Sequence, residues 1–576
     1  MYIFKAIGTG SELYAVEIRP SLNPHRRIAI SPSAPNRYTI EMSSAGSNAY
    51  IDDISYQCDD SPVLNAEKSK IAEWFAHTNV LITGGTGFLG KLIVEKLLRS
   101  CPDITRIYIV VRPKKGKSSE QRFRENFEDA VYDKLRREQP NFLNKVIMVD
   151  GDAMQEDYGL SPETKAMLMN TNIIFHAAAT VRFDEKIRLA VNINVKGTRS
   201  LLLFAKQMPN LKSFVHISTA FSNCIHKYID EIHYRPPIDG DKLISLLDIF
   251  DDQKLEEITP ILLKNWPNMY IFSKAVGEGI VAKYSEGIPT CIVRPSIVLS
   301  TFEEPLYGWT NNLYGTTGVI IGAGLGLLHT LHCIPENTAE MIPADYVVST
   351  TIAAAWAASN KQSSEILDKD SNISVDERIP IYNSVSSVQN PISWGACMNI
   401  AANFGLEIPS TQCIWYYMLI LNRYLILHKI CAFIFHFVPA TVVDMLAYVS
   451  GRKPKLLDAY KKIDKFSTVI HYFSTQEWNF CDDNVQKLWQ GLNSTDQGIF
   501  KFNIKNLDWN EFFYCSMRGI RMYMVKDPLD TVEAACRRYR KLKIAHYTIM
   551  TLFFLLMAWV TVHFLSFLWS LCPLAH

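Results

Sequence analysis

The sequence predicts an α/β protein. We expect a Rossmann-like, doubly wound parallel sheet, then a mainly helical C-terminal domain and a C-terminal transmembrane helix. Short apolar strands alternate with stretches of helical spacing, a pattern typical of parallel sheets. A glycine-rich turn joins the first strand to the first long helix. An apolar segment long enough to cross a bilayer covers residues 547–571.

Composition divides the chain into four parts. Residues 1–65 are rich in Ser, Pro and Asn without sustained periodicity, so we expect a disordered tail there. Residues 66–375 contain the alternating strands and helices and should form the Rossmann-like domain. We expect a second, helical domain over 376–540, and a basic flank with the membrane helix over 541–576.

Charge and cysteine content exclude some classes of protein. The net charge of +1 provides no global field, so nucleic acid is not an expected partner. The 12 cysteines are scattered and no Cys-x-x-Cys pair occurs, which argues against zinc and dithiol redox sites. Most of the chain should therefore lie in a reducing compartment. Oligomeric state stays open, with a homo-oligomer among the alternatives.

The glycine-rich turn predicts a nucleotide site. An apolar strand at 79–82 precedes it and a helical pattern at 91–98 follows it, which is the context such a motif requires. Gly84 permits a tight turn, Gly87 lets a pyrophosphate approach the backbone, and Gly90 lets helix and strand pack closely. The alternative is an ordinary structural turn. The expected cofactor-binding residues of this turn are Thr83, Gly84, Gly85, Thr86, Gly87, Phe88, Leu89 and Gly90.

The second strand, 106–111, indicates which nucleotide binds. An NAD site usually has a carboxylate at the end of this strand, for the ribose 2′-hydroxyl. This chain has Arg112 and Lys114 instead. Cations suit a 2′-phosphate, so NADPH is favoured over NADH. An ordinary solvated basic loop is the alternative.

Three further strands are expected at 146–149, 172–175 and 213–217. Ligands of such sheets sit at the C-terminal ends of the strands. The residues that follow these ends, and are therefore candidates for the site, are Asp152, Ala177, Ser218 and Thr219.

Tyr270 and Lys274 are spaced to lie on one helix face. A lysine ammonium favours the phenolate, so we expect Lys274 to lower the pKa of Tyr270. The hydroxyl of Thr219 or Ser218 would hold a substrate carbonyl oxygen. Asn194 is a further candidate. These residues together predict a hydride-transfer site.

The ensemble resembles the extended short-chain dehydrogenases/reductases and, more narrowly, the alcohol-forming fatty acyl-CoA reductases, over roughly residues 70 to 540. The motifs that carry the resemblance are 83–90, 111–116, 217–220, 270–274, 294–298 and 341–348, the insert 236–268, and 436–440 with Asp444. Three residues depart from the family pattern. Phe221 replaces a tyrosine, and Leu325 and His329 stand where cations are expected, which puts coenzyme A affinity or acyl-carrier preference in doubt.

The resemblance implies NADPH-dependent reduction of a long-chain fatty acyl-CoA to a primary alcohol and free coenzyme A, through an aldehyde. Tyr270 would donate the proton, Lys274 would tune it and hold the cofactor ribose, and Thr219, with Ser218 next to it, would stabilise the oxyanion. Expected cofactor contacts outside the glycine-rich turn are Arg112, Lys114, Asp152, Ala177, Asn194, Tyr270, Lys274 and Pro295. The insert 236–268 and residues 380–530 are candidates for covering the acyl chain.

Two other functions are compatible with parts of this sequence. A membrane-bound hydroxysteroid dehydrogenase of the same superfamily would use the same Tyr–Lys pair but should not need a large C-terminal domain. A nucleotide-binding membrane scaffold without turnover should lack a catalytic residue, and none is missing.

The segment 547–571 should be a single membrane-spanning helix, with lipid as a partner. The basic stretch 537–543 precedes it, so the catalytic part should face the cytosol. We expect the endoplasmic reticulum in preference to the peroxisome. A buried soluble helix is the alternative. In the apolar region 413–449, charged residues and a proline interrupt the pattern, so we expect no membrane-length stretch there. The region forms either core helices of the second domain or helices that dip into the membrane or line a lipid tunnel.

Overall fold

The computed structural model describes residues 67–114, 116–365 and 378–570. The predicted tail 1–65 lies outside the described residues, as does the expected boundary at 375/376.

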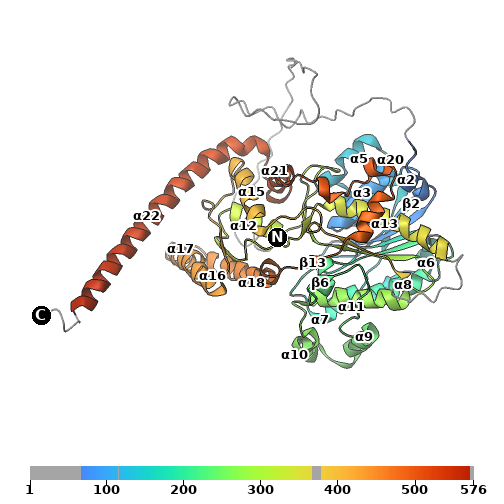
Figure 1. The fold of residues 1–576 in the computed structure, drawn as a ribbon, viewed down its shortest axis with the longest axis horizontal. Coiled ribbons are helices and arrows are strands. Elements are labelled where there is room, and N and C mark those ends of the chain that lie inside the picture. Colours follow the sequence, from blue (N-terminus) through green and yellow to red (C-terminus); the bar gives the residue numbers. More distant parts are fainter. Residues whose placement is uncertain (1–66, 115, 366–377, 571–576) are drawn as a thin grey trace, which may run out of the picture. The chain divides into compact units, whose positions relative to one another are not determined.

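A seven-stranded, wholly parallel sheet organises the N-terminal part, with strand order β11-β7-β5-β4-β1-β2-β3 (Figure 1). The strands are β1 (Asn79–Thr83), β2 (Arg106–Val111), β3 (Val146–Asp150), β4 (Ile173–His176), β5 (Ser213–Ile217), β7 (Thr290–Pro295) and β11 (Ile381–Ser384). The five strands expected from the sequence are all present, and the predicted fold class is confirmed. β11, which lies beyond residue 375, is one of the two edge strands of this sheet.

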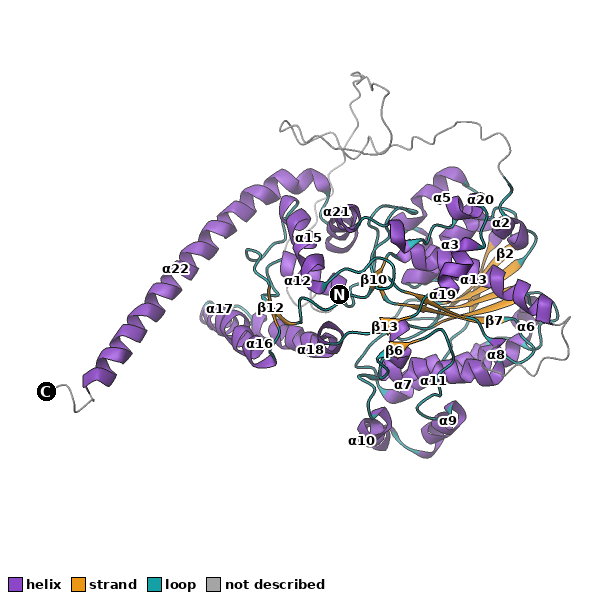
Figure 2. Cartoon of the chain, viewed as in Figure 1, coloured by secondary structure: helices purple, strands orange, loops and turns teal. Residues whose placement is uncertain are grey.

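Helices cover both faces of the sheet (Figure 2). On one face, α3 (Phe88–Ser100) and α13 (Ala344–Glu365) pack together against the strands. On the other, α7 (Ile187–Val191), α8 (Gly197–Ala205) and α11 (Met269–Tyr284) pack in the same way. β1 pairs with β2 on one side and β4 on the other, so the order in which the chain adds strands to the sheet reverses beside β1. This is the switch point at which such sheets bind ligands.

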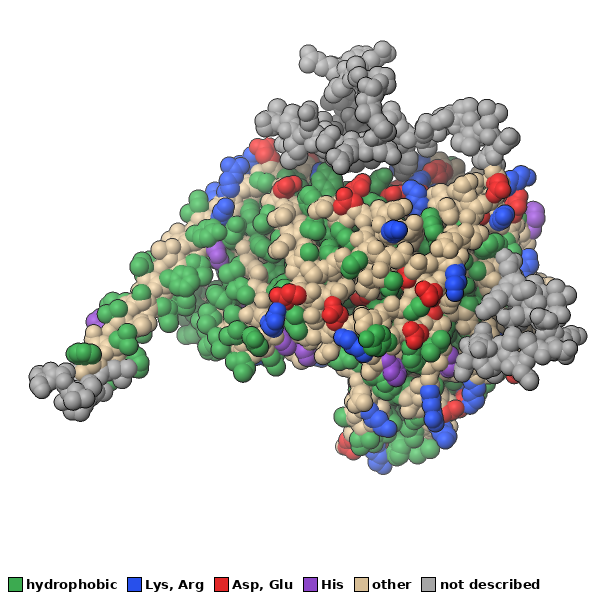
Figure 3. All heavy atoms as spheres, in the orientation of Figure 1, with side chains coloured by type: hydrophobic (Ala, Val, Ile, Leu, Met, Phe, Trp, Pro, Cys, Tyr) green, Lys and Arg blue, Asp and Glu red, His purple; other side chains and the backbone are tan. Residues whose placement is uncertain are grey.

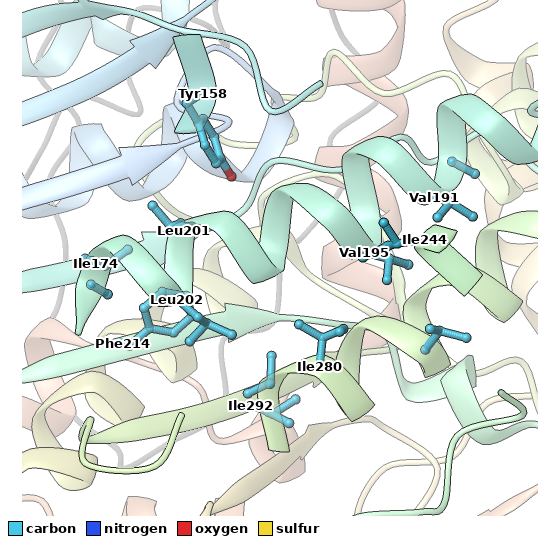
Figure 4. Packing of buried hydrophobic residues seen from close by; sticks show 14 of the residues in the cluster. Tyr158, Ile174, Val191, Val195, Leu201, Leu202, Phe214, Ile244, Ile280 and Ile292 are labelled. Atoms are coloured by element: carbon cyan, nitrogen blue, oxygen red, sulfur yellow. The ribbon is translucent and has the colours of Figure 1, made fainter. Parts of the chain in front are cut away.

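Apolar side chains on the second face interlock with the sheet. Figure 4 shows Ile174, Phe214 and Ile292 of the strands against Leu202 of α8 and Ile280 of α11. All five side chains are buried. Close packing of this kind makes the helix α11 a rigid support for the residues it carries.

Further helices border the sheet. They are α2 (Lys70–Phe75), α4 (Ser119–Phe127), α5 (Asp133–Glu138), α6 (Pro162–Leu168), α9 (Gly240–Ile249) and α10 (Asp252–Leu263). The last two belong to the insert 236–268, and their apolar residues extend the same core.

The C-terminal part is mainly helical, as predicted. Its helices are α15 (Trp394–Glu407), α16 (Leu425–Ala432), the π-helical η6 (Phe433–Phe437), α17 (Val438–Val449), α18 (Leu456–Thr475), α19 (Asp483–Gln490), α20 (Ser494–Ile499), α21 (Trp509–Gly519) and α22 (Val532–Ser570). A helix from before the expected boundary, α12 (Thr316–Gly324), packs against α15 and so joins this part. Three short parallel pairs accompany them: β6 (Tyr228–Ile229) with β13 (Asn479–Phe480), β8 (Ile297–Val298) with β10 (Met341–Ile342), and β9 (Thr330–His332) with β12 (Ile420–Asn422). The β6–β13 pair joins the C-terminal part to the loop after β5.

Two helical stretches among the described residues are long and apolar enough to cross a membrane, Leu425–Val449 and Leu529–Phe567. The first corrects the sequence interpretation, which found no membrane-length stretch in 413–449. The interruptions that suggested otherwise, among them Pro439 in the first turn of α17, do not break the helix. Pro439 has no N–H to donate, and it stands just after the π-helical turn η6, where the regular α-helical hydrogen-bond pattern is already interrupted.

Candidate active site

The glycine-rich turn leaves the C-terminal end of β1 at the switch point. Gly84 adopts a left-handed φ of +74°, and a Cβ on it would lie 2.7 Å from the backbone of Ala177 after β4. A Cβ on Gly90 would lie 2.1 Å from the carbonyl oxygen of Gly84. Both positions therefore require glycine. The contact of Gly84 with Ala177 joins the ends of β1 and β4 into one edge.

α3 begins at Phe88 directly after this turn, and its N-cap residue Gly87 makes no side-chain cap. The first N–H groups of a helix have no intrahelical partner, so they form a positive end suited to an anion. Thr83, in the last position of β1, bonds His176 at 2.7 Å and receives a bond of 3.2 Å from the N–H of Ala178. The hydroxyl of Thr83 thus ties the start of the glycine-rich turn to the end of β4.

Two arginines, Arg112 and Arg122, lie beside the glycine-rich turn. Arg112 follows β2, and its guanidinium is 3.4 Å from Oδ2 of Asp152. Arg122 of α4 donates 3.1 Å to the hydroxyl of Thr86 and also bonds the carbonyl of Arg112. Burial and the neighbouring Arg112 lower the pKa of Arg122. Sequence analysis missed Arg122, because only the fold brings α4 back to the turn. Lys114 is exposed on the loop after Arg112.

The expected catalytic residues gather on α11 and after β5. Tyr270 is hydrogen-bonded to Thr219. Lys274, one turn further along α11, donates 2.7 Å to the carbonyl of Ile217. The hydroxyl of Thr219 also lies 3.4 Å from the carbonyl oxygen of Pro295. The structure thus brings together Thr219, Tyr270 and Lys274.

The pKa of Tyr270 is shifted in the direction opposite to the one expected from the sequence. Burial raises the pKa of Tyr270 to about 12, with the bond to Thr219 acting against it. Burial also lowers the pKa of Lys274 to about 8, opposed by Glu278. The expected lowering of the pKa of Tyr270 by the Lys274 ammonium does not occur: burial raises this pKa, and the opposing contribution comes from Thr219. Tyr270 is consequently a protonated phenol at neutral pH.

Ser218 points elsewhere. Its hydroxyl bonds Glu278, as does that of Ser222. Glu278 also forms a buried ion pair with Arg294 at 2.7 Å. Adjacent residues of an extended segment face opposite sides. Ser218 is therefore part of a buried polar network rather than a neighbour of Tyr270.

Asn194 links two elements behind the site. It lies in the π-helical segment η4 (Asn192–Lys196), and its side chain donates 2.9 Å to Ser273 on α11 and 3.2 Å to the carbonyl of Thr180. Its amide oxygen accepts from the N–H of Thr180 at 3.0 Å. Asn194 therefore fixes the segment after β4 relative to the helix that carries Tyr270.

An aromatic wall adjoins Tyr270. Phe183 stacks on Tyr270 with ring centroids 5.8 Å apart, and Phe473 of α18 contacts Phe183 at 5.7 Å. Phe221 packs against Phe473 at 5.1 Å. The buried cluster around them also includes Trp478 and Phe480. Sequence analysis did not name this wall, because its members are up to about three hundred positions apart.

The three departures from the family pattern are buried. Phe221 belongs to the aromatic wall, whereas Leu325 and His329 lie inside the C-terminal part. The backbone N–H of His329 donates 2.9 Å to His436, and burial lowers the pKa of His329 to about 4. These two positions hold neutral, enclosed side chains.

Comparison with known proteins gives matches over most of the chain. Two family models, both described as male sterility protein, match residues 82–351 and 435–527. The chain is 37% identical to the fatty acyl-CoA reductase wat of Drosophila melanogaster, over 86% of this chain and 93% of that protein. It is 35% identical to fatty acyl-CoA reductase 2 of Homo sapiens, over 85% and 93%. Among solved structures, the reductase domain of a nonribosomal peptide synthetase from Mycobacterium tuberculosis matches 78% of this chain and 92% of its own, with a TM-score of 0.49 and 16% identity.

Proposed function

Since this chain belongs to the family of the fatty acyl-CoA reductases and is thus an oxidoreductase, we propose that it uses NADPH to reduce a long-chain fatty acyl-CoA to a primary alcohol and free coenzyme A, through an aldehyde. The observation that carries the proposal is the arrangement of Thr219, Tyr270 and Lys274 at the C-terminal edge of the sheet, beside the glycine-rich turn.

The residues at the switch point fit a dinucleotide. Gly84 and Gly90 leave room that a Cβ would fill, and the N-terminus of α3 suits a pyrophosphate. Arg112 and Arg122 are two neighbouring cations, and a 2′-phosphate would offset their repulsion. We propose that they select NADPH over NADH, with Thr83, Lys114, Asp152, Ala177, Asn194 and Pro295 lining or bracing the rest of the site. The reduced nicotinamide, when bound, supplies a hydride.

Thr219 and Tyr270 would hold the substrate carbonyl oxygen. Both are hydroxyl donors, and they are already in contact. Donors aimed at an oxygen that becomes negative stabilise the transition state. Because the pKa of Tyr270 is raised, its phenol carries the proton that the oxygen needs. Lys274 would hold the cofactor ribose and replace the proton.

The overall reaction requires two reductions. In the first, the thioester carbon is reduced, its C–S bond breaks, and coenzyme A leaves as a thiol. In the second, the aldehyde carbonyl becomes a primary alcohol, with Tyr270 as proton donor. In total, one acyl-CoA consumes two NADPH and two protons.

The aromatic wall is our proposed site for the first carbons of the acyl chain. Phe183, Phe221 and Phe473 present apolar surface next to Tyr270. Each methylene removed from water contributes about 0.8 kcal/mol. A hydroxysteroid dehydrogenase should not need a large C-terminal domain, whereas Phe473 of this wall belongs to one.

We propose that α22 anchors the enzyme in the membrane as a single span. From Ile549 onward its apolar side chains are mostly exposed, among them Leu552, Trp559 and Phe567. The basic residues at 537–543 precede this stretch, so the catalytic part would face the cytosol, on the endoplasmic reticulum.

Product analysis tests the reaction. The full-length enzyme in vesicles receives NADPH and a mixed pool of acyl-CoA, with a 3-hydroxysteroid and its ketone in parallel, and mass spectrometry identifies the products. We expect fatty alcohol and free coenzyme A, and at least about 10²-fold less alcohol with Tyr270→Phe. Steroid turnover without alcohol formation would contradict the proposal, as would consumption of NADPH that ends at the aldehyde.

A further inference from the structure

Helix 425–449, formed by α16, η6 and α17 in one continuous run, has an inverted distribution of polarity. The side chains that face the protein are small or polar: His428, Ala432, His436 and Ala440 are buried. The large apolar side chains face outward. They are Leu425, Ile426, Leu427, Ile430, Phe433, Val438, Val442, Val443, Met445, Leu446, Tyr448 and Val449. A helix on the surface of a water-soluble protein shows the opposite arrangement.

The outward side chains are widely exposed, with 63% for Leu446 and 83% for Val449. Figure 3 shows hydrophobic side chains gathered over this region and along α22. A continuous apolar surface of this kind marks an interaction site.

The two charged residues of the helix are both directed to α18. Lys429 pairs with Asp464 at 3.0 Å. Asp444 accepts three backbone bonds of 2.8 to 3.0 Å from the N-terminus of α18, at Lys455, Leu456 and Leu457. Neither charge therefore interrupts the outward apolar face.

The same contacts argue against a membrane span. α18 runs back along the helix, and the Tyr460 ring stacks on His436 at 4.8 Å. α18 carries the exposed cations Lys461, Lys462 and Lys465, and Lys465 pairs with Asp184 of the Rossmann-like part. Drawing the helix across a bilayer would carry these charges into hydrocarbon, which is costly.

The segment that precedes helix 425–449 contacts the base of α22. Trp415 donates 3.0 Å to His546, and the N–H of Tyr417 donates 3.0 Å to the hydroxyl of Tyr539. The segment 413–417 thus holds the last polar turns of α22 and leads within eight residues to α16. The bilayer that α22 would enter is therefore next to the outward face, and the exposed cations Arg452, Lys453 and Lys455 lie at its far end.

We propose that helix 425–449 lies in the plane of the membrane, with its outward face embedded in the cytosolic leaflet at the boundary between headgroups and acyl chains. Interfacial helices of this type embed about 5–10 Å deep, flanked by cations that contact anionic lipids. α18 connects this surface to Phe473 of the aromatic wall. The in-plane helix would hold the active site over the leaflet from which long acyl chains arrive.

Site-specific fluorescence tests this placement in the full-length chain. A genetically encoded fluorescent amino acid replaces Ile426, Val438 or Val449 on the outward face, or Lys461 on α18 as the matched control. Each chain is reconstituted in phosphatidylcholine vesicles containing phosphatidylserine. Quenchers are aqueous iodide and lipids with a nitroxide either near the headgroup or near the chain end.

We expect the shallow nitroxide to quench the three outward positions equally, with iodide ineffective there, and iodide alone to quench the label at Lys461. Deep quenching at Val438 with shallow quenching at both ends would mean a span and overturn the proposal. Shielding from every quencher would indicate a second copy of the chain on this face, and quenching by iodide would indicate water; both overturn it.

The inference rests on the proposed function only in taking the protein to be bound to a membrane. Alcohol formation is measured on the same vesicles, so quenching without turnover would defeat the enzymatic proposal alone. If a labelled chain is inactive, the neighbouring exposed positions Tyr424, Val442 and Tyr448 serve as second sites.

Discussion

Ser218 donates a hydrogen bond of 2.5 Å to Oε1 of Glu278, whereas its neighbour Thr219 contacts Tyr270. The two hydroxyls come from consecutive residues but serve different environments. Ser218 helps to satisfy the buried Glu278–Arg294 ion pair, and Thr219 lies at the proposed reaction centre.

Thr219→Ala should lower kcat by about 10²–10³-fold, the usual loss for one oxyanion donor. Ser218→Ala should leave kcat near the wild-type value but lower the free energy of unfolding by about 1.5–3 kcal/mol, because it removes a bond to a buried charge. Kinetics at saturating NADPH and denaturant unfolding separate the two effects. A silent Thr219→Ala beside a severe kinetic defect in Ser218→Ala would reverse the assignment.

Tyr270→Phe should lower kcat for aldehyde reduction by about 10²–10⁴-fold, since the phenol is the proposed general acid. The phenyl ring keeps the stacking on Phe183, so the site should keep its shape. Because the glycine-rich turn and Arg112 are unchanged, NADPH affinity should change little. Tyr472→Phe, on α18, is the matched control and should remain active. Wild-type alcohol output from Tyr270→Phe would remove it from the mechanism.

Arg112→Asp should weaken NADPH binding about 10- to 100-fold more than NADH binding, because the lost partner is the 2′-phosphate. Arg122→Ala should shift the preference in the same direction. The exposed Arg124 on α4 provides the control, Arg124→Ala. Titration with NADPH and NADH gives the affinity for each cofactor. If the ratio of the two affinities is unchanged in both variants, residues other than Arg112 and Arg122 select the cofactor.

The pH dependence of cofactor use should reflect Lys274. Its pKa is lowered to about 8, so the ammonium that would hold the ribose is lost as pH rises through that value. We expect kcat/KM for NADPH to fall above about pH 8 and to stay level below it. In Lys274→Arg, whose side chain stays charged, this fall in kcat/KM at high pH should disappear. If kcat/KM of Lys274→Arg still falls above about pH 8, the fall belongs to another group.

The same shift has a consequence for stability. The pKa of Lys274 is lower in the folded protein than in the unfolded chain, so the unfolded chain binds more protons between the two values. Stability therefore rises with pH through this window, starting near 8. Lys274→Met should remove that rise in unfolding experiments, whereas Lys283→Met, at an exposed position, should not.

Removal of residues from Tyr547 onward should release the protein from carbonate-resistant insertion, because α22 is the proposed span. The shortened chain should still bind vesicles in neutral buffer through helix 425–449. Val443→Asp combined with Leu446→Asp should abolish that residual binding. Full resistance of the shortened chain to carbonate would show that α22 is not the main anchor.

Much of the fold was predictable because its signals are local. The strand, turn and helix around Gly84 and Gly90 are read from adjacent residues, and so is the spacing of Tyr270 and Lys274 on one helix face. The apolar length of α22 is likewise a property of one segment. Periodicity and turn chemistry act over a few residues, and tertiary contacts did not override them.

Other features depend on residues that are distant in sequence. Only the tertiary structure placed Arg122 against Thr86, turned Ser218 toward Glu278, and set Phe473 beside Phe183. Only packing could show that the apolar residues of helix 425–449 face outward. Such outcomes follow from how separate elements meet. The raised pKa of Tyr270 likewise follows from its burial in the folded protein, which the spacing of residues along the chain does not encode.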